Sequence, residues 1–309
     1  MMGASFARSP TAAMRLDLLA GTRHLARPPS LPVRRPTILV FDSGLGGLTV
    51  FDHVTRLCGG ADLVYAADDA AFPYGALSEP ALVRRVLDVM HVLLTLHAPD
   101  LVVIACNTAS TLVLPHLRAR YPLPFVGTVP AIKPAAEGTR SGLISVLATP
   151  GTVRRDYTHE LVDTYAGRCR VNLVGAVRLA GFAEAEMAGE PVPDEVLRRE
   201  IAPCFVEDGA ARTDTVVLAC THYPLLLRRF QALAPWPVTW IDPSPAIARR
   251  VADLLGPLGA GREISEVTAV FTSGISLTPA LRSALCLRGV GEIVLNPLPL
   301  CLDRIACAA

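Results

Sequence analysis

The stretch Val102-Val103-Ile104-Ala105-Cys106 decides the fold prediction, because it recurs later in the chain as Val216-Val217-Leu218-Ala219-Cys220. Each copy is a short apolar run that ends in cysteine and is followed by two polar residues, one of which is threonine. A continuous apolar run of this length is typical of a strand that is buried on both faces of a parallel sheet. Two copies at a domain-sized separation therefore predict two similar α/β domains, each with a thiol at the carboxyl end of a strand.

From Thr37 onward, short apolar runs alternate with longer amphipathic stretches, such as the predicted helix Glu79–His97. The expected strands are Thr37–Phe41, Leu63–Ala66, Leu101–Ala105, Phe125–Gly127, Leu143–Leu147, Val171–Val174, Thr215–Ala219, Val238–Ile241 and Thr268–Thr272. This alternation predicts an α/β fold of two similar domains with mainly parallel, doubly wound sheets. We expect the active site in the cleft between the domains, because ligands bind beyond the carboxyl ends of parallel strands.

The predicted domain organisation divides the chain into three parts. Residues 37–128 and 240–309 form the first α/β domain, and residues 129–239 form the second. Residues 1–36 carry six arginines against one acid, Asp17, and end in a proline-rich run. We interpret this segment as a disordered extension or a start codon assigned too early; a transit peptide has the same arginine-rich, acid-poor character.

The composition excludes several classes of protein. With 51% hydrophobic and 18% charged residues, the chain of 309 residues is not mainly disordered, and its net charge of +1 gives no field for direct binding of nucleic acid or membranes. Eight cysteines without a CxxC pair predict neither a disulfide scaffold nor a metal site, so we expect reduced thiols and a cytoplasmic protein.

Lys133 is the only lysine and lies in a proline-flanked loop without a phosphate cradle, which argues against a pyridoxal-phosphate Schiff base.

Cys106 and Cys220 are the cysteines for which we predict chemistry. A thiol at the carboxyl end of a strand, where a helix begins, lies near unpaired N–H groups and a positive dipole end, which favour the thiolate. His222, two residues after Cys220, is placed to exchange a proton with that thiol. The same residues would also suit a helix N-terminus, with Pro224 in its first turn.

The first expected strand leads into Asp42-Ser43-Gly44-Leu45-Gly46-Gly47-Leu48-Thr49. Its glycines would let the backbone approach an anionic ligand, but their spacing is not a dinucleotide fingerprint and the loop has no Walker lysine. Asp42 is a candidate base for a neighbouring thiol. A second loop, Asp68–Gly75, contains a turn around Pro73 and places Tyr74 where it could cap a ligand or bond a carboxylate.

Together these segments resemble the glutamate racemase family over roughly residues 37–275. The matching motifs are Asp42-Ser43-Gly44-Leu45-Gly46-Gly47-Leu48-Thr49-Val50, Phe72-Pro73-Tyr74-Gly75, Ala105-Cys106-Asn107-Thr108-Ala109 and Cys220-Thr221-His222-Tyr223-Pro224-Leu225-Leu226, with weaker matches at Gly127-Thr128-Val129-Pro130 and Leu147-Ala148-Thr149. The resemblance implies a cofactor-independent isomerase that interconverts L- and D-glutamate for peptidoglycan synthesis.

The resemblance also implies a role for each matched residue. Cys106 and Cys220 would be the acid and base on opposite faces of the substrate α-carbon, the first acting on D-glutamate and the second on L-glutamate. The further catalytic residues would be Asp42 beside Cys106, His222 beside Cys220, and Glu184. The substrate-binding residues would be Asp42, Ser43, Asp68, Tyr74, Gly75, Asn107, Thr108, Thr221 and His222.

Other readings of the sequence remain open. Aspartate and hydantoin racemases share the two-cysteine architecture, although His222 after Cys-Thr favours glutamate. The chain could instead be a protein that only binds an acidic amino acid, or a thiol–disulfide enzyme in which the two cysteines meet. As partners, the resemblance implies a small-molecule substrate (L-/D-glutamate), a homodimer and, through the family alone, an interaction with DNA gyrase.

Overall fold

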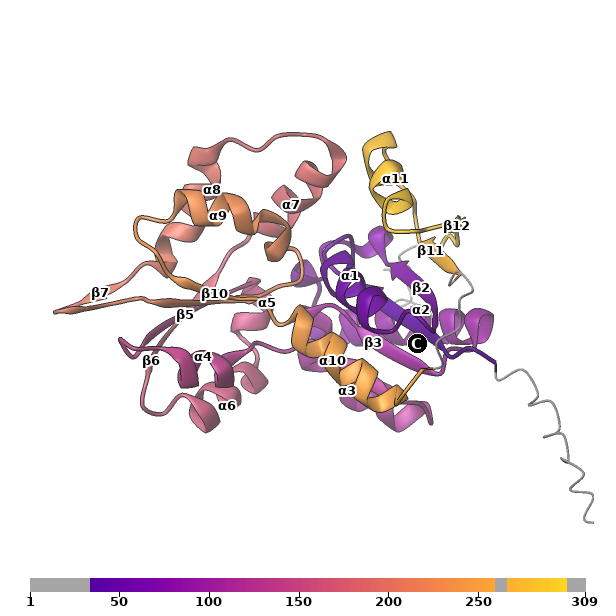
Figure 1. The fold of residues 1–309 in the computed structure, drawn as a ribbon, viewed down its shortest axis with the longest axis horizontal. Coiled ribbons are helices and arrows are strands. Elements are labelled where there is room, and N and C mark those ends of the chain that lie inside the picture. The colour runs from indigo at the N-terminus through magenta and orange to yellow at the C-terminus, as the bar shows by residue number, and fades with distance from the viewer. Residues whose placement is uncertain (1–33, 259–265, 299–309) are drawn as a thin grey trace, which may run out of the picture. The chain divides into compact units, whose positions relative to one another are not determined.

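The computed structural model describes residues 34–258 and 266–298, so most of the predicted extension at residues 1–36 lies outside the described residues. Six strands form a parallel sheet in the order β12-β11-β2-β1-β3-β4 (Figure 1). They are β1 (Thr37–Asp42), β2 (Asp62–Ala67), β3 (Leu101–Ile104), β4 (Phe125–Gly127), β11 (Val267–Phe271) and β12 (Glu292–Leu295). The register pairs Asp42 with Ala67 and Phe41 with Ile104, so the loops that follow β1, β2 and β3 begin at one edge of the sheet.

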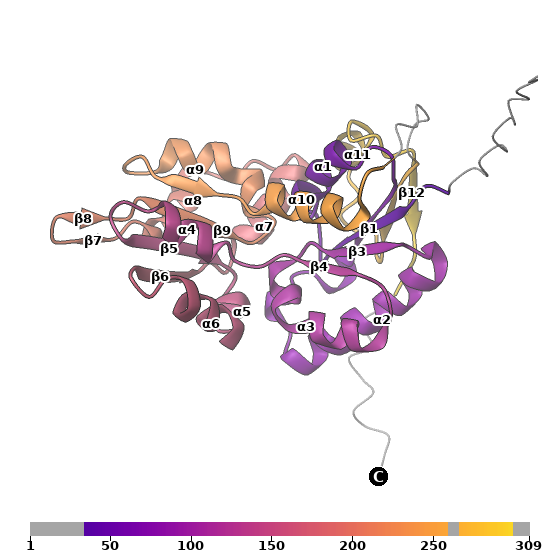
Figure 2. The same cartoon turned by 60° about the horizontal axis from the view of Figure 1, so that its bottom comes forward.

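Helices cover both faces of the six-stranded sheet, as Figure 2 shows. One face carries α1 (Leu48–Leu57), α10 (Ser244–Leu255) and α11 (Pro279–Cys286), and the other carries α2 (Glu79–His97) and α3 (Asn107–Arg120). The strands alternate between the two cores: Ile38 and Val40 contact the first set of helices, whereas Leu39 and Phe41 contact the second. Strands that are buried on both faces need the continuous apolar sequence seen at residues 38–41.

The second sheet is parallel and has the order β10-β9-β5-β6. Its strands are β5 (Leu143–Ala148), β6 (Arg170–Gly175), β9 (Thr215–Ala219) and β10 (Thr239–Ile241). One face packs against α7 (Leu179–Ala188), α8 (Asp194–Ile201) and α9 (Leu227–Leu233), and the other against α4 (Ile132–Gly138) and α6 (Asp156–Tyr165). A short helix, α5 (Pro150–Val153), follows β5, and a small hairpin of β7 (Glu207–Asp208) and β8 (Ala211–Arg212) precedes β9.

The predicted fold class is confirmed: both sheets are parallel, and helices cover both faces of each. All nine expected strands are present to within one or two residues, and the helix Glu79–His97 has the predicted bounds. Strand β12 and the hairpin β7–β8 were not predicted from the sequence. Both are hard to find because β12 has only intermediate or exposed residues, and the hairpin strands have two residues each.

The chain passes between the two sheets twice, after β4 and after β10. Trp240 and Ile241 still pair with β9 in the four-stranded sheet, whereas the next helix, α10, packs against α1 beside the six-stranded sheet. We call residues 35–128, 242–258 and 266–298 the first lobe and residues 129–241 the second lobe. The division of the chain into domains at residues 128 and 240 stays a prediction.

Among the described residues, no helix combines the length and the apolar character needed to cross a lipid bilayer.

Asp214, at the start of β9, joins the turn that precedes β5 to the four-stranded sheet. Its carboxylate accepts hydrogen bonds from the backbone N–H groups of Arg140 (2.7 Å) and Ser141 (2.8 Å) and from the hydroxyl groups of Thr139 and Thr215. Burial alone would raise the pKa of Asp214, but these four donors lower it to about 2. Hydrogen bonds to the charged form therefore outweigh desolvation at this carboxylate.

We expect Asp214→Asn to lower the free energy of unfolding by about 1 kcal/mol at pH 7, a value discounted for solvent screening of this partly exposed group. Because the folded-state pKa lies below the ordinary value of 3.8, the carboxylate stabilises the fold above that pH and loses its effect as the pH falls toward 2. Urea unfolding at several pH values should therefore show the two proteins converging in acid. Asp208→Asn, which removes an exposed ion pair with Arg170, is the control and should change stability by less than about 0.5 kcal/mol. An offset that did not depend on pH would contradict this account.

Candidate active site

The loop that follows β1 folds around the carboxylate of Asp42. One carboxylate oxygen accepts a hydrogen bond from the N–H of Ser43 (2.7 Å), and the other accepts one from the N–H of Gly47. Thr221 of the second lobe donates its hydroxyl to the same carboxylate (3.4 Å). Asp42 is completely buried, and this burial raises the pKa of its carboxyl group, although His222 and the backbone donors oppose the shift. A buried carboxylate is thus shared by both lobes.

The glycines of this loop are required by its close approach to the second lobe. A Cβ on Gly46 would lie 2.3 Å from Nδ1 of His222, and one on Gly44 would lie 2.1 Å from a carboxylate oxygen of Glu184. The intervening residue, Leu45, donates its N–H to Glu184 (2.7 Å). The loop after β1 therefore seals one side of the site against α7 and the loop after β9.

Cys106 follows β3 and is the N-cap residue of α3. Its sulfur lies 3.7 Å from the hydroxyl oxygen of Ser43, and the N–H of Ala109, in the first turn of α3, also points to it. Burial raises the pKa of the Cys106 thiol well above its usual value, and the charge of Asp42 raises it further. Cys106 therefore holds its proton at neutral pH, and Ser43, not Asp42, is the polar group in contact with it.

Cys220 follows β9 and has a different set of neighbours. Its sulfur lies 3.9 Å from Nδ1 of His222, and Nε2 of His222 lies 2.9 Å from the carboxylate of Glu184. Burial alone would lower the pKa of His222, but the interactions with Cys220 and Glu184 raise it well above its usual value. The imidazole is therefore the cationic form, which donates from Nδ1 toward sulfur and from Nε2 toward Glu184.

The N–H of Gly46 also lies 3.1 Å from Nε2 of His222. This nitrogen cannot accept a hydrogen bond from Gly46 while it donates one to Glu184. The raised pKa of His222 favours the cationic form, in which Nε2 donates to Glu184; in the neutral form with a proton on Nδ1, Nε2 accepts the hydrogen bond from Gly46 instead.

Polar donors and acceptors surround the two sulfurs. Neither polar atom of the Asn107 side chain has a hydrogen-bond partner in the part of the chain that is described, and the residue is 2% exposed. The hydroxyl groups of Thr108, Thr149 and Thr152 lie within 2.9 to 3.3 Å of one another, where α3 of the first lobe meets α5 of the second. A buried amide without a partner costs free energy unless a ligand satisfies it.

Both thiols line one pocket of about 20 Å³ between the lobes. The residues that line it are Ser43, Phe72, Pro73, Tyr74, Gly75, Cys106, Asn107, Thr108, Thr149, Ala180, Cys220, Thr221 and His222. The structure thus brings together nine residues that the sequence analysis assigned to the site. Asp42 and Glu184 contact lining residues from behind but do not line the pocket themselves.

Asp68 also lies outside the pocket lining. It is completely buried, and both carboxylate oxygens accept hydrogen bonds, from Tyr74, Arg85 and Thr272. The expected contact between Asp68 and substrate therefore has no support in this geometry.

Four lining residues were not assigned to the site from the sequence: Phe72, Pro73, Thr149 and Ala180. Thr149 carried a usable signal, because it is the polar residue directly after the buried strand β5, in the same position that Cys220 has after β9. The sequence contains no signal for Ala180, because a small apolar residue within a helix is common and does not by itself indicate a binding site.

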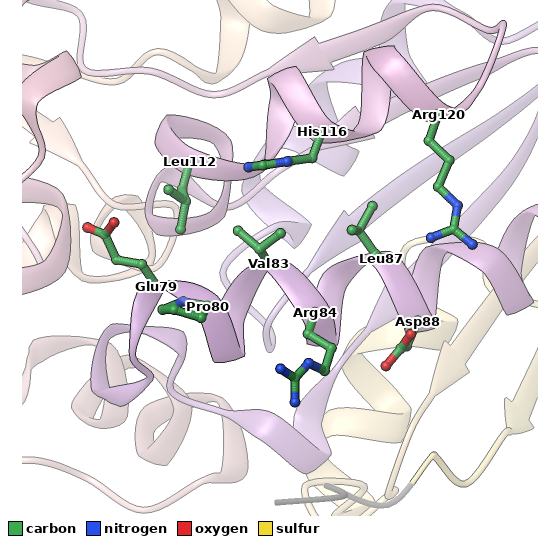
Figure 3. A pocket seen from close by; sticks show the side chains of 9 residues that line it. All are labelled: Glu79, Pro80, Val83, Arg84, Leu87, Asp88, Leu112, His116 and Arg120. Atoms are coloured by element: carbon green, nitrogen blue, oxygen red, sulfur yellow. The ribbon is translucent and has the colours of Figure 1, made fainter. Parts of the chain in front are cut away.

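A larger hollow of about 570 Å³ lies between α2 and α3 (Figure 3). Its apolar floor includes Val83, Leu87 and Leu112, and charged residues of both signs, among them Arg84 and Asp88, stand along its edges. It contains none of the residues assigned to chemistry. Among the described residues, no cluster of histidine, cysteine or acidic side chains could hold a metal ion.

The chain is similar to known proteins in sequence and in fold. The sequence profile of the Asp/Glu/Hydantoin racemase family matches residues 38–251. The chain is 59% identical to a glutamate racemase of Mesorhizobium japonicum over 239 residues, which cover 77% of this chain and 91% of that protein. It is 56% identical to a glutamate racemase of Brucella anthropi, over 76% of this chain and 85% of that protein.

A solved structure shows the same fold. The crystal structure of Escherichia coli glutamate racemase, in complex with L-glutamate and the activator UDP-MurNAc-Ala, superposes with a TM-score of 0.77 at 39% identity. The match covers 85% of this chain and 99% of that one. On the matched sequence, the fold and the two thiols in one pocket, this chain belongs to the Asp/Glu/hydantoin racemase family and is an isomerase of the racemase type.

Proposed function

We propose that this protein is a cofactor-independent glutamate racemase that interconverts L- and D-glutamate through two thiols and supplies D-glutamate for peptidoglycan. One observation carries the proposal: the buried, free thiols of Cys106 and Cys220 come from the strand ends of different lobes and line the same pocket. Inversion of a chiral carbon is simplest when a base and an acid face it from opposite sides. The choice of glutamate is supported by the curated relatives and the Escherichia coli enzyme.

In the direction from L to D, the thiolate of Cys220 removes the α-proton and the thiol of Cys106 delivers its own proton to the opposite face. The raised pKa of Cys106 supports its role as the acid in this direction. In the reverse direction, the two thiols exchange roles. Each turnover leaves one sulfur protonated and the other not, so the proton count balances without a cofactor.

The carbanion formed between these steps needs stabilisation, because no electron sink is proposed. The amide of Asn107 and the hydroxyl groups of Thr108 and Thr221 are the side-chain groups we assign to the substrate α-amino and carboxylate groups, and α3 directs its N-terminus to the same place. Such preorganised donors are commonly the largest contribution to lowering a barrier of this kind.

The position of Lys133 supports a mechanism without pyridoxal phosphate. This only lysine of the chain lies on helix α4, whereas a loop was predicted from the sequence. Its side chain is 61% exposed and lies near Glu137 and the ring of Tyr165. It does not line the pocket. The cytoplasmic location, the homodimer and the gyrase interaction stay predictions.

The two-thiol mechanism predicts a specific isotope pattern. In deuterated water, each enantiomer of glutamate should yield the opposite enantiomer with deuterium at Cα, while the remaining substrate keeps its proton at early times. Chiral chromatography with mass spectrometry measures both pools. Equal deuterium in both pools from the start would indicate a single base, and exchange of aspartate but not glutamate would move the assignment to the sister family.

Removal of either thiol should abolish racemisation. We expect Cys106→Ala and Cys220→Ala each to lower kcat by at least about 10³-fold with little change in melting temperature, because each removes one of two required proton carriers. Cys204→Ala is the matched control, since Cys204 is equally buried but lies in the core of the second lobe. Full activity in Cys106→Ala would disprove the two-thiol mechanism.

Glu184 should act through His222. We expect Glu184→Gln to lower the pKa of His222 and to reduce kcat/KM by roughly 10- to 100-fold. Because the folded-state pKa is raised, the imidazolium persists above pH 6.5 and is lost as the pH rises; in the variant this loss should occur at lower pH. Nuclear magnetic resonance titration of the imidazole nitrogens measures the pKa.

Glu186→Gln is the matched control for Glu184. Glu186 lies two residues further along α7, where its carboxylate binds Arg229 and the N–H of Val192, away from the pocket. The Glu186→Gln variant should leave the titration of His222 unchanged. An unchanged pKa of His222 in Glu184→Gln would refute the proposed role of Glu184.

A further inference from the structure

Asp68 forms a saturated hydrogen-bond cluster directly behind the pocket. One carboxylate oxygen accepts hydrogen bonds from the hydroxyl of Tyr74 (2.6 Å) and from Nε of Arg85 (2.8 Å). The other accepts from a terminal nitrogen of Arg85 (2.5 Å) and from the hydroxyl of Thr272 (2.7 Å). Asp68 is 0% exposed and Arg85 is 8% exposed, so this is a buried, bidentate ion pair.

Tyr74 connects this cluster to the pocket. It is 1% exposed, its ring lies 6.4 Å from that of Phe41, and it lines the pocket together with Gly75 and Cys106. A phenol has one proton to donate, and that of Tyr74 is directed to Asp68, away from the pocket. The hydroxyl of Tyr74 is thus an anchor for the loop and is not a donor to substrate.

We propose that Asp68 and Arg85 are positioning residues for racemisation: they fix Tyr74, and through it the Tyr74–Gly75 segment, at the distance from Cys106 that the bound substrate needs. This inference rests on the proposed function, because it names residues that serve the same pocket. Neither residue touches the pocket, and both act through the phenol.

Arg85 is required because the carboxylate of Asp68 is fully removed from water. A buried carboxylate without a partner is strongly unfavourable, whereas a bidentate guanidinium satisfies both oxygens and fixes their plane. The guanidinium comes from α2 and the hydroxyl of Thr272 from the end of β11. The cluster therefore ties the loop after β2 to two neighbouring elements of the first lobe.

The neighbouring residue Asp69 offers a matched control. Its carboxylate accepts hydrogen bonds from the N–H (2.7 Å) and hydroxyl (2.6 Å) of Ser273 and from the N–H of Gly274 (2.8 Å), and it is 8% exposed. Asp69 therefore connects the loop after β2 to the segment that follows β11, as Asp68 does. None of these hydrogen bonds involves Tyr74.

The test compares Asp68→Asn, Tyr74→Phe, the double variant and the control Asp69→Asn. We expect Asp68→Asn and Tyr74→Phe each to lower kcat/KM by about 10- to 100-fold for both enantiomers, mainly through a higher KM, because a misplacement of about 1 Å at a site can have this effect. The double variant should lose no more kcat/KM than the more strongly impaired single variant, since both changes break the same connection. Asp69→Asn should lower the melting temperature but leave both constants within about twofold.

Three outcomes would overturn the inference: wild-type kinetics in Asp68→Asn, losses that multiply in the double variant, or an equal rise of KM in Asp69→Asn. If Asp68→Asn does not fold, Arg85→Lys replaces it, and this change should then have no further effect in the Tyr74→Phe background.

A second readout does not depend on turnover. In a Cys106→Ala background, calorimetry with L-glutamate should show a Kd about tenfold higher when Asp68→Asn is added. Absence of glutamate turnover in the wild-type protein would instead refute the proposed function.

Discussion

The close approach of the loop after β1 to His222 and Glu184 is the constraint on which the rest of the site depends. The same loop has Asp42 at its base and Ser43 beside Cys106, and its outer side contacts the group that serves Cys220. One short backbone segment thus contacts Cys106 on one side and the partners of Cys220 on the other. Because a Cβ on Gly46 would lie 2.3 Å from the imidazole, any larger residue there would push the lobes apart.

The same constraint makes the pocket small. Its volume of about 20 Å³ is close to the room needed for one water molecule, whereas pockets that hold small molecules measure roughly 300 to 1,000 Å³. An amino acid can enter only if contacts between the lobes give way. Those contacts include the hydrogen bond from Leu45 to Glu184 and the ion pair between Arg155 and Glu79. Each contributes on the order of 1 kcal/mol net, so the closed form can open without loss of either core.

The sequence predicted the fold well because buried parallel strands have an unmistakable pattern. The runs that end at Cys106 and Cys220 are buried along their whole length and lie where they were expected. The two thiols could be placed for the same reason, since the end of such a strand marks the edge where ligands bind. Asp68 also follows a buried strand, but it was assigned to substrate only through the resemblance to the racemase family.

The sequence could not show which of these side chains face the pocket. Asp68 turns away from the pocket because Arg85, on a helix face 17 residues later, provides a buried partner that no local pattern reveals. The contact of Glu184 with Leu45 and His222 likewise depends on how the two lobes meet. The end of a strand can be predicted from the local sequence pattern. The partner of a buried charge cannot, because it depends on the tertiary structure.

The two thiols have unequal surroundings, and this inequality bears on a reaction whose substrate and product are mirror images. Cys106 has the hydroxyl of Ser43 and the charge of Asp42 nearby, whereas Cys220 has the imidazolium of His222. Under the two-thiol proposal, the form that accepts L-glutamate needs a proton on Cys106, and the raised pKa of this thiol favours that proton. The equilibrium constant between enantiomers is one, so kcat/KM must be equal in both directions however unequal the sites are. An asymmetric protein can thus favour one enantiomer in KM only by giving up the same factor in kcat for that enantiomer.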